Sequence, residues 1–341
     1  MPDKSSLENV TDCNSSICKM NDLRKESVTY LKVDESGAGQ RIDNFLARHL
    51  KGVPKSHLYR ILRSGEVRVN KGRVDAARKL ELGDEIRIPP IRVAAPQMNR
   101  PSVLPKGGIR LVERILYHNE GLLVLDKPAG MAVHGGSGVS LGVIEQLRLE
   151  MPEQRFLELA HRLDRETSGV LMLATKRSAL VALHDMMRAN QMDKRYFALV
   201  LGRWTDALRH IKQPLHKYLN AEGERRVLAS ADGQSAHTVF RLQRNWANFS
   251  LLEAELKTGR THQIRVHLAH AGFPIAGDDK YGDFTRNKAL AKTGLKRMFL
   301  HAHRVSIKHP LSGEMLILEA PLPAELADFL LQLDRDEHKT L

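Results

Sequence analysis

Five prolines fall within residues 89–108 and divide the chain into two parts. Proline fixes a backbone dihedral and has no amide hydrogen, so the segment PPIRVAAPQMNRPSVLPKGG cannot form a regular helix or an inner strand. We therefore expect a semi-rigid linker at residues 93–108, with a separate domain on each side. A length of 341 residues also suits two domains better than one.

The part before the linker has the pattern of a compact helix–helix–strand unit. Apolar residues recur at helical spacing in residues 41–50 and again in residues 55–64, with a glycine and a proline between the two segments. Residues 66–70 alternate as a strand does, and a turn and a second strand follow within residues 71–88. We expect this unit, residues 40–92, to fold on its own.

Residues 1–28 are polar and carry few large apolar side chains, so we expect a disordered tail. Both cysteines of the chain, Cys13 and Cys18, fall in this tail, which leaves the folded part without a disulfide framework. No apolar run approaches the length of a membrane span, and the N-terminus lacks the pattern of a signal peptide. We expect a cytoplasmic protein with no membrane segment.

The chain is strongly basic, with 53 Lys and Arg against 40 Asp and Glu and a formal net charge of +13. Such a charge suits a polyanionic partner such as nucleic acid, although a basic protein without that role has the same composition. One group of basic residues clusters on the second helix of the small unit and on the strand and turn after it. This basic strip consists of Lys55, Arg60, Arg63, Arg68, Lys71 and Arg73. We interpret it as a surface for RNA phosphates, with a solvated helix face as the alternative.

The part after the linker mixes strand-like runs with isolated helices. Runs such as GLLVLDKP, GVLMLAT and FSLLEAEL have the length and composition of strands, whereas residues 177–190, 261–271 and 323–334 have helical spacing. The order lacks the regular strand–helix–strand alternation of a parallel sheet. We therefore expect an α+β protein in which residues 109–335 form a domain with a mostly antiparallel sheet.

The densest group of polar residues is HRLDRETSG at residues 161–169, and an apolar strand follows it at once. Asp164 thus lies in a loop that a buried strand holds in place, a position suited to a catalytic carboxylate. Four charges and a histidine in so short a run need partners or water, so a structural ion-pair loop is the alternative.

Residues 40–92 resemble the S4-type RNA-binding domain of ribosomal protein S4. The resemblance rests on GQRIDNFLARHLKGVPKSHLYRILRSGEVRVNKGR and on the later GDEIRI. It implies binding of structured RNA rather than catalysis, and it favours the RNA interpretation of the basic strip.

Four motifs after the linker resemble those of the pseudouridine synthases whose type member modifies both ribosomal and transfer RNA. LLVLDKPAGMAVH carries the Lys127–Pro128 pair, HRLDRETSG carries Asp164, KRYFALVLG carries Tyr196, and LKTGRTHQIRVHLAHAGFPIAGDDKYG carries Arg265. VHGGSGVSLGVIEQLR and GVPKSHLYRILRSGEVRVNKGR are most similar to the type C members of the family. The resemblance implies an isomerase that converts specific uridines of 23S (large-subunit) ribosomal RNA to pseudouridine.

The resemblance also implies a role for each motif residue. Asp164 is the expected nucleophile, Tyr196 is expected to stack on the uracil, and Arg162 is expected to fill the space that the flipped uridine leaves in the RNA. An aspartate is ionised at neutral pH, and an arginine beside it keeps it so even when it is buried. We expect Arg265 to be that arginine, as a two-point partner of Asp164. Whether Asp164 attacks the sugar or the base stays open.

The reaction is redox-neutral and needs no external energy, so we expect no cofactor and no metal. The spacings of His262, His267 and His270, and of His301 and His303, are unlike those of a zinc site. The expected partner is large-subunit ribosomal RNA or a ribosome assembly intermediate, bound by a monomer. The alternatives that stay open are the sister type D enzyme, a non-catalytic RNA-binding assembly factor, and a hydrolase that releases free uracil.

Overall fold

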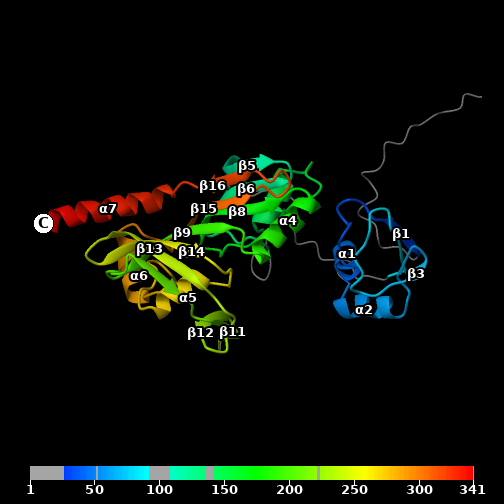
Figure 1. Cartoon of the computed structure of the whole chain (residues 1–341), viewed down its shortest axis with the longest axis horizontal. Coiled ribbons are helices and arrows are strands. Elements are labelled where there is room, and N and C mark those ends of the chain that lie inside the picture. The colour runs from blue at the N-terminus through cyan, green and yellow to red at the C-terminus, as the bar shows by residue number, and fades with distance from the viewer. Residues whose placement is uncertain (1–26, 51–52, 92–107, 136–140, 221–222, 341) are drawn as a thin grey trace, which may run out of the picture. The chain divides into compact units, whose positions relative to one another are not determined.

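The structure, a computed structural model, describes residues 27–50, 53–91, 108–135, 141–220 and 223–340. The chain divides into two compact units, Met1–Met98 and Asn99–Leu341 (Figure 1). The expected tail and the expected linker lie almost entirely outside the described residues, so both stay predictions.

The small unit packs two helices on a short four-stranded sheet of order β1-β4-β2-β3. Its elements are β1 (Thr29–Lys32), α1 (Ile42–His49), α2 (Lys55–Arg63), β2 (Arg68–Val69), β3 (Gly72–Arg73) and β4 (Glu85–Ile88). Both helices are amphipathic, and each buries three apolar side chains in a common core. The expected helices are present, whereas β1, which pairs antiparallel with β4, was not predicted.

The large unit contains the remaining elements. Its first half comprises η1 (Val112–Arg114), β5 (Ile115–Asn119), β6 (Leu122–Lys127), α3 (Val143–Glu150), β7 (Glu158–Leu159), β8 (Ser168–Ala174), α4 (Arg177–Arg188) and β9 (Asp193–Leu201). Its second half comprises β10 (Leu208–Ile211), β11 (Leu215–Leu219), β12 (Arg225–Ala229), β13 (Thr238–Asn245), β14 (Phe249–Leu256), α5 (Gln263–His270), α6 (Phe284–Lys292), β15 (Leu300–Lys308), β16 (Met315–Glu319) and α7 (Ala324–Thr340).

A ten-stranded sheet runs through the large unit in the order β10-β13-β14-β9-β15-β8-β6-β5, with β7 and β16 paired beside β8 and β15. Among the described strands, only β15 and β8 pair in parallel. β11 and β12 form a separate hairpin. The expected α+β class with a mostly antiparallel sheet is confirmed.

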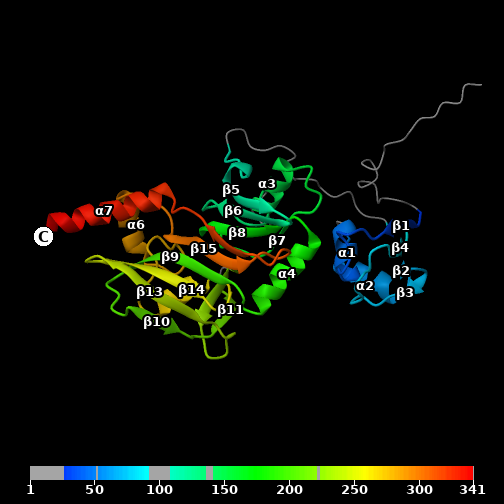
Figure 2. The same cartoon turned by 45° about the horizontal axis from the view of Figure 1, so that its top comes forward.

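Helices cover both faces of this sheet (Figure 2). On one face, α3 and α5 pack on alternate residues of β6, β8 and β9, such as Leu171 and Ala198. On the other face, α4 packs on the intervening residues, such as Val170, and α6 and α7 pack farther along β9. β8 is therefore buried on both faces, which makes it a rigid support for the loop before it.

The described helices include none with both the length and the apolar composition that crossing a membrane requires.

Candidate active site

Asp164 lies in the loop between β7 and β8, in the wall of a cavity of about 640 Å³ in the large unit. The loop turns tightly, because the amide of Thr167 donates to the carbonyl oxygen of Asp164 at 3.1 Å. The buried strand that follows fixes the loop to the middle of the sheet. The side chain of Asp164 is 26% exposed, so a ligand in the cavity has access to its carboxylate.

Lys127, at the end of β6, supports this loop from within the core. Its side chain is fully buried, and its Nζ donates to the carbonyl oxygens of Pro128, Met131 and Arg165 at 2.8, 2.8 and 3.0 Å. Burial lowers the pKa of Lys127 to about 7. The lysine thus joins the loop after β6 to the loop that carries Asp164, and it orders both backbones.

Arg265 projects from α5 and lies beside Asp164, with Nη1 3.4 Å from Oδ2 of the aspartate. The arginine is buried, which disfavours its charge, but hydrogen bonds and the negative charge of Asp278 outweigh burial and raise its pKa. The same pairing lowers the pKa of Asp278, although burial opposes this. A permanent positive charge therefore stands next to Asp164.

The expectation that Arg265 pairs with Asp164 at two points is wrong. The two-point partner is Asp278, which accepts from Nε at 2.8 Å and from Nη2 at 2.7 Å. Asp278 is 1% exposed and also accepts from the amides of Lys280 and Tyr281, so its carboxylate is ordered before any ligand binds. Arg265 is held by Asp278 and presents its remaining nitrogen, Nη1, to Asp164.

Tyr196 lies in β9 and lines the same cavity. Its side chain is buried, and burial together with the negative charge of Asp164 raises the pKa of its phenol. The phenol therefore keeps its proton at neutral pH. A flat ring with a protonated hydroxyl thus stands in the wall of the cavity that holds the carboxylate.

His262 precedes α5 and brings an imidazole towards Asp164. Its backbone is left-handed, with φ of 53°, which is uncommon for a residue with a side chain. Nδ1 lies 2.8 Å from the hydroxyl of Tyr281, and Nε2 lies 3.8 Å from Oδ1 of Asp164. Burial lowers the pKa of His262, so the imidazole is neutral at neutral pH.

Comparison with known proteins identifies the family to which this site belongs. The family model described as RNA pseudouridylate synthase matches residues 121–270, which contain Asp164, Tyr196 and Arg265. The chain is 51% identical to ribosomal large subunit pseudouridine synthase C of Escherichia coli (strain K12) over 309 residues, which are 90% of this chain and 97% of that protein. The chain belongs to the RNA pseudouridylate synthase family.

Further comparisons agree for both units of this pseudouridine synthase. It is 50% identical to ribosomal large subunit pseudouridine synthase C of Yersinia pestis over 91% of this chain and 97% of that protein. A solved structure of human RNA Pseudouridylate Synthase Domain Containing 4 superposes with a TM-score of 0.55 at 26% identity, covering 66% of this chain and 94% of that chain. The S4 domain model matches residues 40–86. The expected family, fold class and isomerase activity are confirmed.

Positive side chains line the cavity that holds Asp164. Arg162 is exposed there, and within the described residues its side chain makes no hydrogen bond or ion pair. The other cations that line the cavity are Arg165, Lys194, Arg260, Arg265 and Lys280. These outnumber the acidic residues that line it, so the cavity suits a chain of phosphates.

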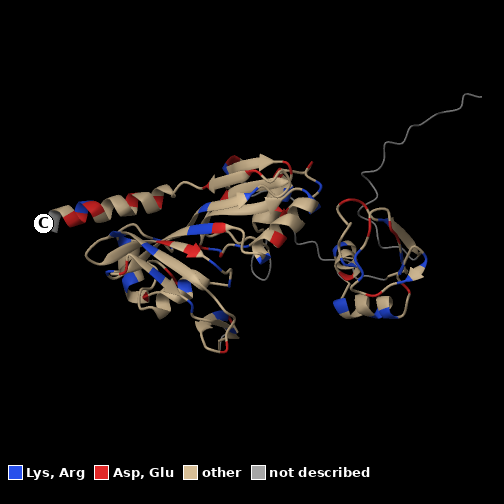
Figure 3. Ribbon diagram, viewed as in Figure 1, with Lys and Arg blue, Asp and Glu red and all other residues tan. Residues whose placement is uncertain are grey.

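The basic strip lies on one part of the small unit, and all its residues are exposed. Figure 3 shows Lys and Arg on α2. Arg68 and Arg73 face each other across β2 and β3. A Cβ on Gly65 would meet Nε of Arg73 at 2.7 Å, so this guanidinium lies against the turn that ends α2. Arg68, Arg73 and the end of α2 are thus adjacent, while contact of the strip with RNA stays a prediction.

Some residues of the site were not singled out by sequence reasoning. Asp278, Tyr281 and Lys194 are among them, and His262 was considered only as a metal ligand. Neighbouring carboxylates at residues 278–279 were the one local signal for Asp278. The others carried no local signal, because their partners lie on other elements.

Two of the remaining histidines have structural roles. His267 is bonded through both ring nitrogens, to the hydroxyl of Thr238 and to the carbonyl oxygen of Gln213. His301 is bonded in the same way to Ser168 and to a backbone oxygen. Across the part of the chain that the structure describes, no group of three His, Cys, Asp or Glu residues could hold a metal ion.

Proposed function

We propose that this pseudouridine synthase isomerises specific uridines of large-subunit ribosomal RNA. The relatives that are about half identical to it carry this substrate in their names, and the chain spans 97% of two of them. The match to an S4 domain at residues 40–86 adds a second RNA-binding part. The observation that supports the chemistry most directly is Asp164, accessible in a cationic cavity beside a permanently charged arginine.

Asp164 is the nucleophile of the reaction. The bond between N1 of the uracil and C1′ of the ribose breaks, the base turns, and C5 forms a new bond to C1′. C5 then loses its proton and N1 gains one, so atoms and electrons balance without an added reagent. A carboxylate that attacks C1′ of the sugar is displaced when C5 bonds to C1′. One that adds to the base leaves when C5 loses its proton and the double bond of the ring forms again.

The neighbours of Asp164 have separate tasks. Arg265 places a fixed positive charge beside the carboxylate, with Nη1 3.4 Å from Oδ2. Tyr196 stacks on the uracil, and its retained proton makes the hydroxyl a hydrogen-bond donor. Arg162, which is exposed at the rim, fills the space that the flipped uridine leaves in the RNA.

The monomer acts in the cytoplasm, on large-subunit RNA that is either free or part of an assembly intermediate. The basic strip holds the RNA through its phosphates while the large unit carries out the reaction.

The test is a map of pseudouridines in large-subunit RNA from a strain that lacks this gene. Specific positions should lose the modification, regain it with the wild-type gene, and stay unmodified with Asp164→Ala. An unchanged map in the deletion strain would contradict the proposed substrate. Free uracil in place of pseudouridine would identify a hydrolase instead.

A further inference from the structure

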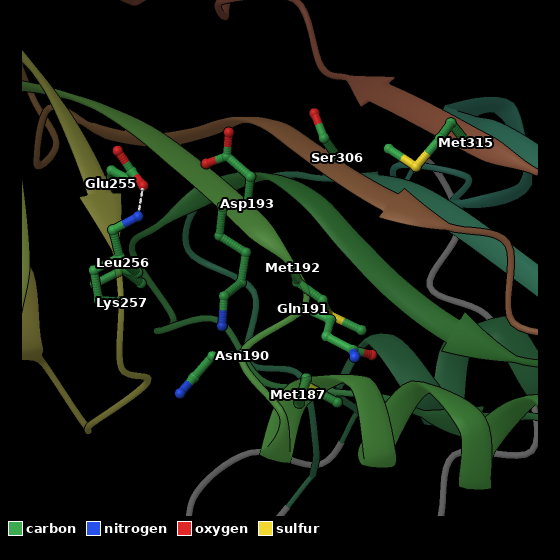
Figure 4. Close-up of a pocket in the computed structure, with 11 residues that line it drawn as sticks. Met187, Asn190, Gln191, Met192, Asp193, Glu255, Leu256, Lys257, Ser306 and Met315 are labelled. Carbon is green, nitrogen blue, oxygen red and sulfur yellow. Dashed lines mark ion pairs between the residues drawn. The ribbon is translucent and has the colours of Figure 1, made fainter.

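A second cavity, of about 330 Å³, lies at the start of β9 (Figure 4). The two cavities share Met187, Lys194 and Leu256 in their walls. Side chains from both faces of the sheet contribute to it, because Asp193 and Lys194 point to opposite faces. A strand of RNA that leaves the catalytic cavity past Lys194 would therefore enter this second space.

Lys194 is the one charged residue among the three described residues that line both cavities. It lies two residues before Tyr196 on β9, so both side chains point to the catalytic face. Its Nζ lies next to Gly259, where an added Cβ would stand 3.8 Å from it. Because Gly259 has no side chain, there is space beside the ammonium. Within the described residues Lys194 makes no hydrogen bond or ion pair, and burial lowers its pKa. A partly buried, unpaired ammonium is unfavourable, so the site favours an anion as ligand.

The second cavity also gathers polar groups that no other residue uses. The side-chain amides of Asn190 and Gln191, just after α4, are exposed and bond to no other residue in the described part of the chain. The Oγ of Ser306 is buried and has no partner there either. The carboxylates there are already occupied. Asp193 binds Arg195, and Glu255 pairs with its neighbouring cations, one of which is Lys257 (Figure 4).

The apolar part of the wall is adaptable. Met187, Met192 and Met315 line it, and methionine fits flat ligands of different shape through its flexible thioether. The volume falls at the lower end of the range of about 300–1,000 Å³ for ligand pockets. Single-stranded RNA offers bases whose edges can be bonded by amide side chains once they are unstacked.

We propose that the second cavity binds the nucleotide next to the target uridine in the RNA. Lys194 binds the phosphodiester that joins the two nucleotides, and Asn190 and Gln191 bind the edge of the neighbouring base. The inference rests on the proposed function, because it assumes an RNA strand with the target uridine in the catalytic cavity. It makes the start of β9 a determinant of which uridines are modified.

The first test combines Lys194→Met with RNA fragments that carry a neutral methylphosphonate on one side or the other of the target uridine. Lys194→Met should weaken RNA binding roughly tenfold. It should also reduce the salt slope, which is the slope of the logarithm of the binding constant against the logarithm of the salt concentration, by about 0.7, as expected when one phosphate is no longer neutralised. One of the two methylphosphonates should weaken RNA binding by the wild type as much as Lys194→Met does. The same methylphosphonate should not weaken RNA binding by Lys194→Met any further. Lys288→Met, an exposed lysine on α6 outside both cavities, removes the same charge as a control.

Equal RNA affinity of Lys194→Met and Lys288→Met would overturn the proposal. It would also be overturned if each methylphosphonate weakened RNA binding by Lys194→Met as much as it weakens binding by the wild type. The folding of Lys194→Met is checked without RNA, where removal of an unpaired buried charge should leave the melting temperature unchanged or raised. A lower melting temperature would indicate a structural lysine and would also count against the proposal. If the wild-type protein forms no pseudouridine in any fragment, the proposed function fails. This outcome differs from a failure of the proposed role of Lys194, in which the wild type is active and Lys194→Met binds RNA as Lys288→Met does.

The second test concerns the base. Wild-type rates should differ by roughly tenfold or more among fragments with each of the four bases beside the target, since one bidentate contact gives discrimination of this size. Asn190→Ala with Gln191→Ala should lower the best rate and reduce the differences. Differences that persist in the double variant would overturn the assignment of the amides.

Discussion

The carboxylate of Asp278 binds the guanidinium of Arg265 at two points, 2.7 and 2.8 Å long, in the core of the large unit. Asp164 receives only the third nitrogen of the same arginine. The charge beside Asp164 is therefore positioned by a residue that does not line the cavity.

We predict that Asp278→Asn lowers the free energy of unfolding by about 3–5 kcal/mol, because it leaves the buried Arg265 without its ion-pair partner. Asp279→Asn is the matched control. Asp279 is 78% exposed and lies 3.4 Å from the same arginine, so its loss should cost at most about 1 kcal/mol. Urea unfolding at neutral pH measures both, and equal losses would contradict the account.

His301 predicts a dependence of stability on pH. Burial lowers its pKa from 6.5 to about 4, whereas the unfolded chain binds the proton near pH 6.5. The folded state therefore binds fewer protons, and stability should fall as pH falls from about 6.5 towards about 4. Between pH 6.5 and pH 5 the titration of His301 should lower the free energy of unfolding by roughly 1.5 kcal/mol.

His301→Gln keeps a hydrogen-bond donor at this position but cannot titrate. Its unfolding free energy should fall less than that of the wild type over the same pH interval, by about the amount that His301 contributes. Urea unfolding at the two pH values measures the difference. Identical pH slopes in the two proteins would show that His301 is not held neutral.

The fold could be predicted where apolar residues follow one period without interruption. β6, β8, β14 and α4 were expected near their observed positions. β15 was missed, because His301, His303 and Arg304 interrupt its apolar alternation. Their polar atoms have remote partners, such as Ser168 for His301 and Glu253 for His303, which only the folded sheet brings close.

Only part of the site could be predicted, because some of its residues have partners that are remote in the sequence. Asp164, Tyr196 and Arg265 belong to recognisable motifs, and the structure brings all three to one cavity. The partner of Arg265 could not be chosen from the sequence, because three carboxylates approach the arginine and burial decides among them. The left-handed backbone of His262 likewise had no signal in the sequence.

We predict that His262→Ala slows pseudouridine formation roughly five- to tenfold without weakening RNA binding, because it removes the neutral imidazole that lies beside Asp164, with Nε2 3.8 Å from Oδ1. His262→Asn tolerates the left-handed backbone but is too short to reach the carboxylate, so it should fold well and be equally slow. Single-turnover rates and binding are measured together. A wild-type rate in His262→Asn would show that the imidazole has no part in the reaction.

Charge reversal in the basic strip tests its role in RNA binding. Arg60→Glu with Arg63→Glu should weaken binding and reduce the salt slope by about 0.7 for each phosphate that the variant no longer binds, with the rate at saturating RNA much less affected. Removal of residues 1–95 should have a larger effect in the same direction. Lys32→Glu with Lys79→Glu changes the charge equally at exposed positions outside the strip. If the two double variants bind alike, the strip is not an RNA surface.

The nucleophile itself is tested by single-turnover kinetics with Asp164→Asn and Asp164→Ala on a large-subunit RNA fragment, with chelator present and no nucleotide added. Loss of the attacking carboxylate should reduce pseudouridine formation by at least about 10⁴-fold. RNA affinity should stay within about threefold of wild type, because the phosphates are bound by other residues. Pseudouridine formed at nearly the wild-type rate by Asp164→Ala would contradict the assignment of Asp164 as the nucleophile.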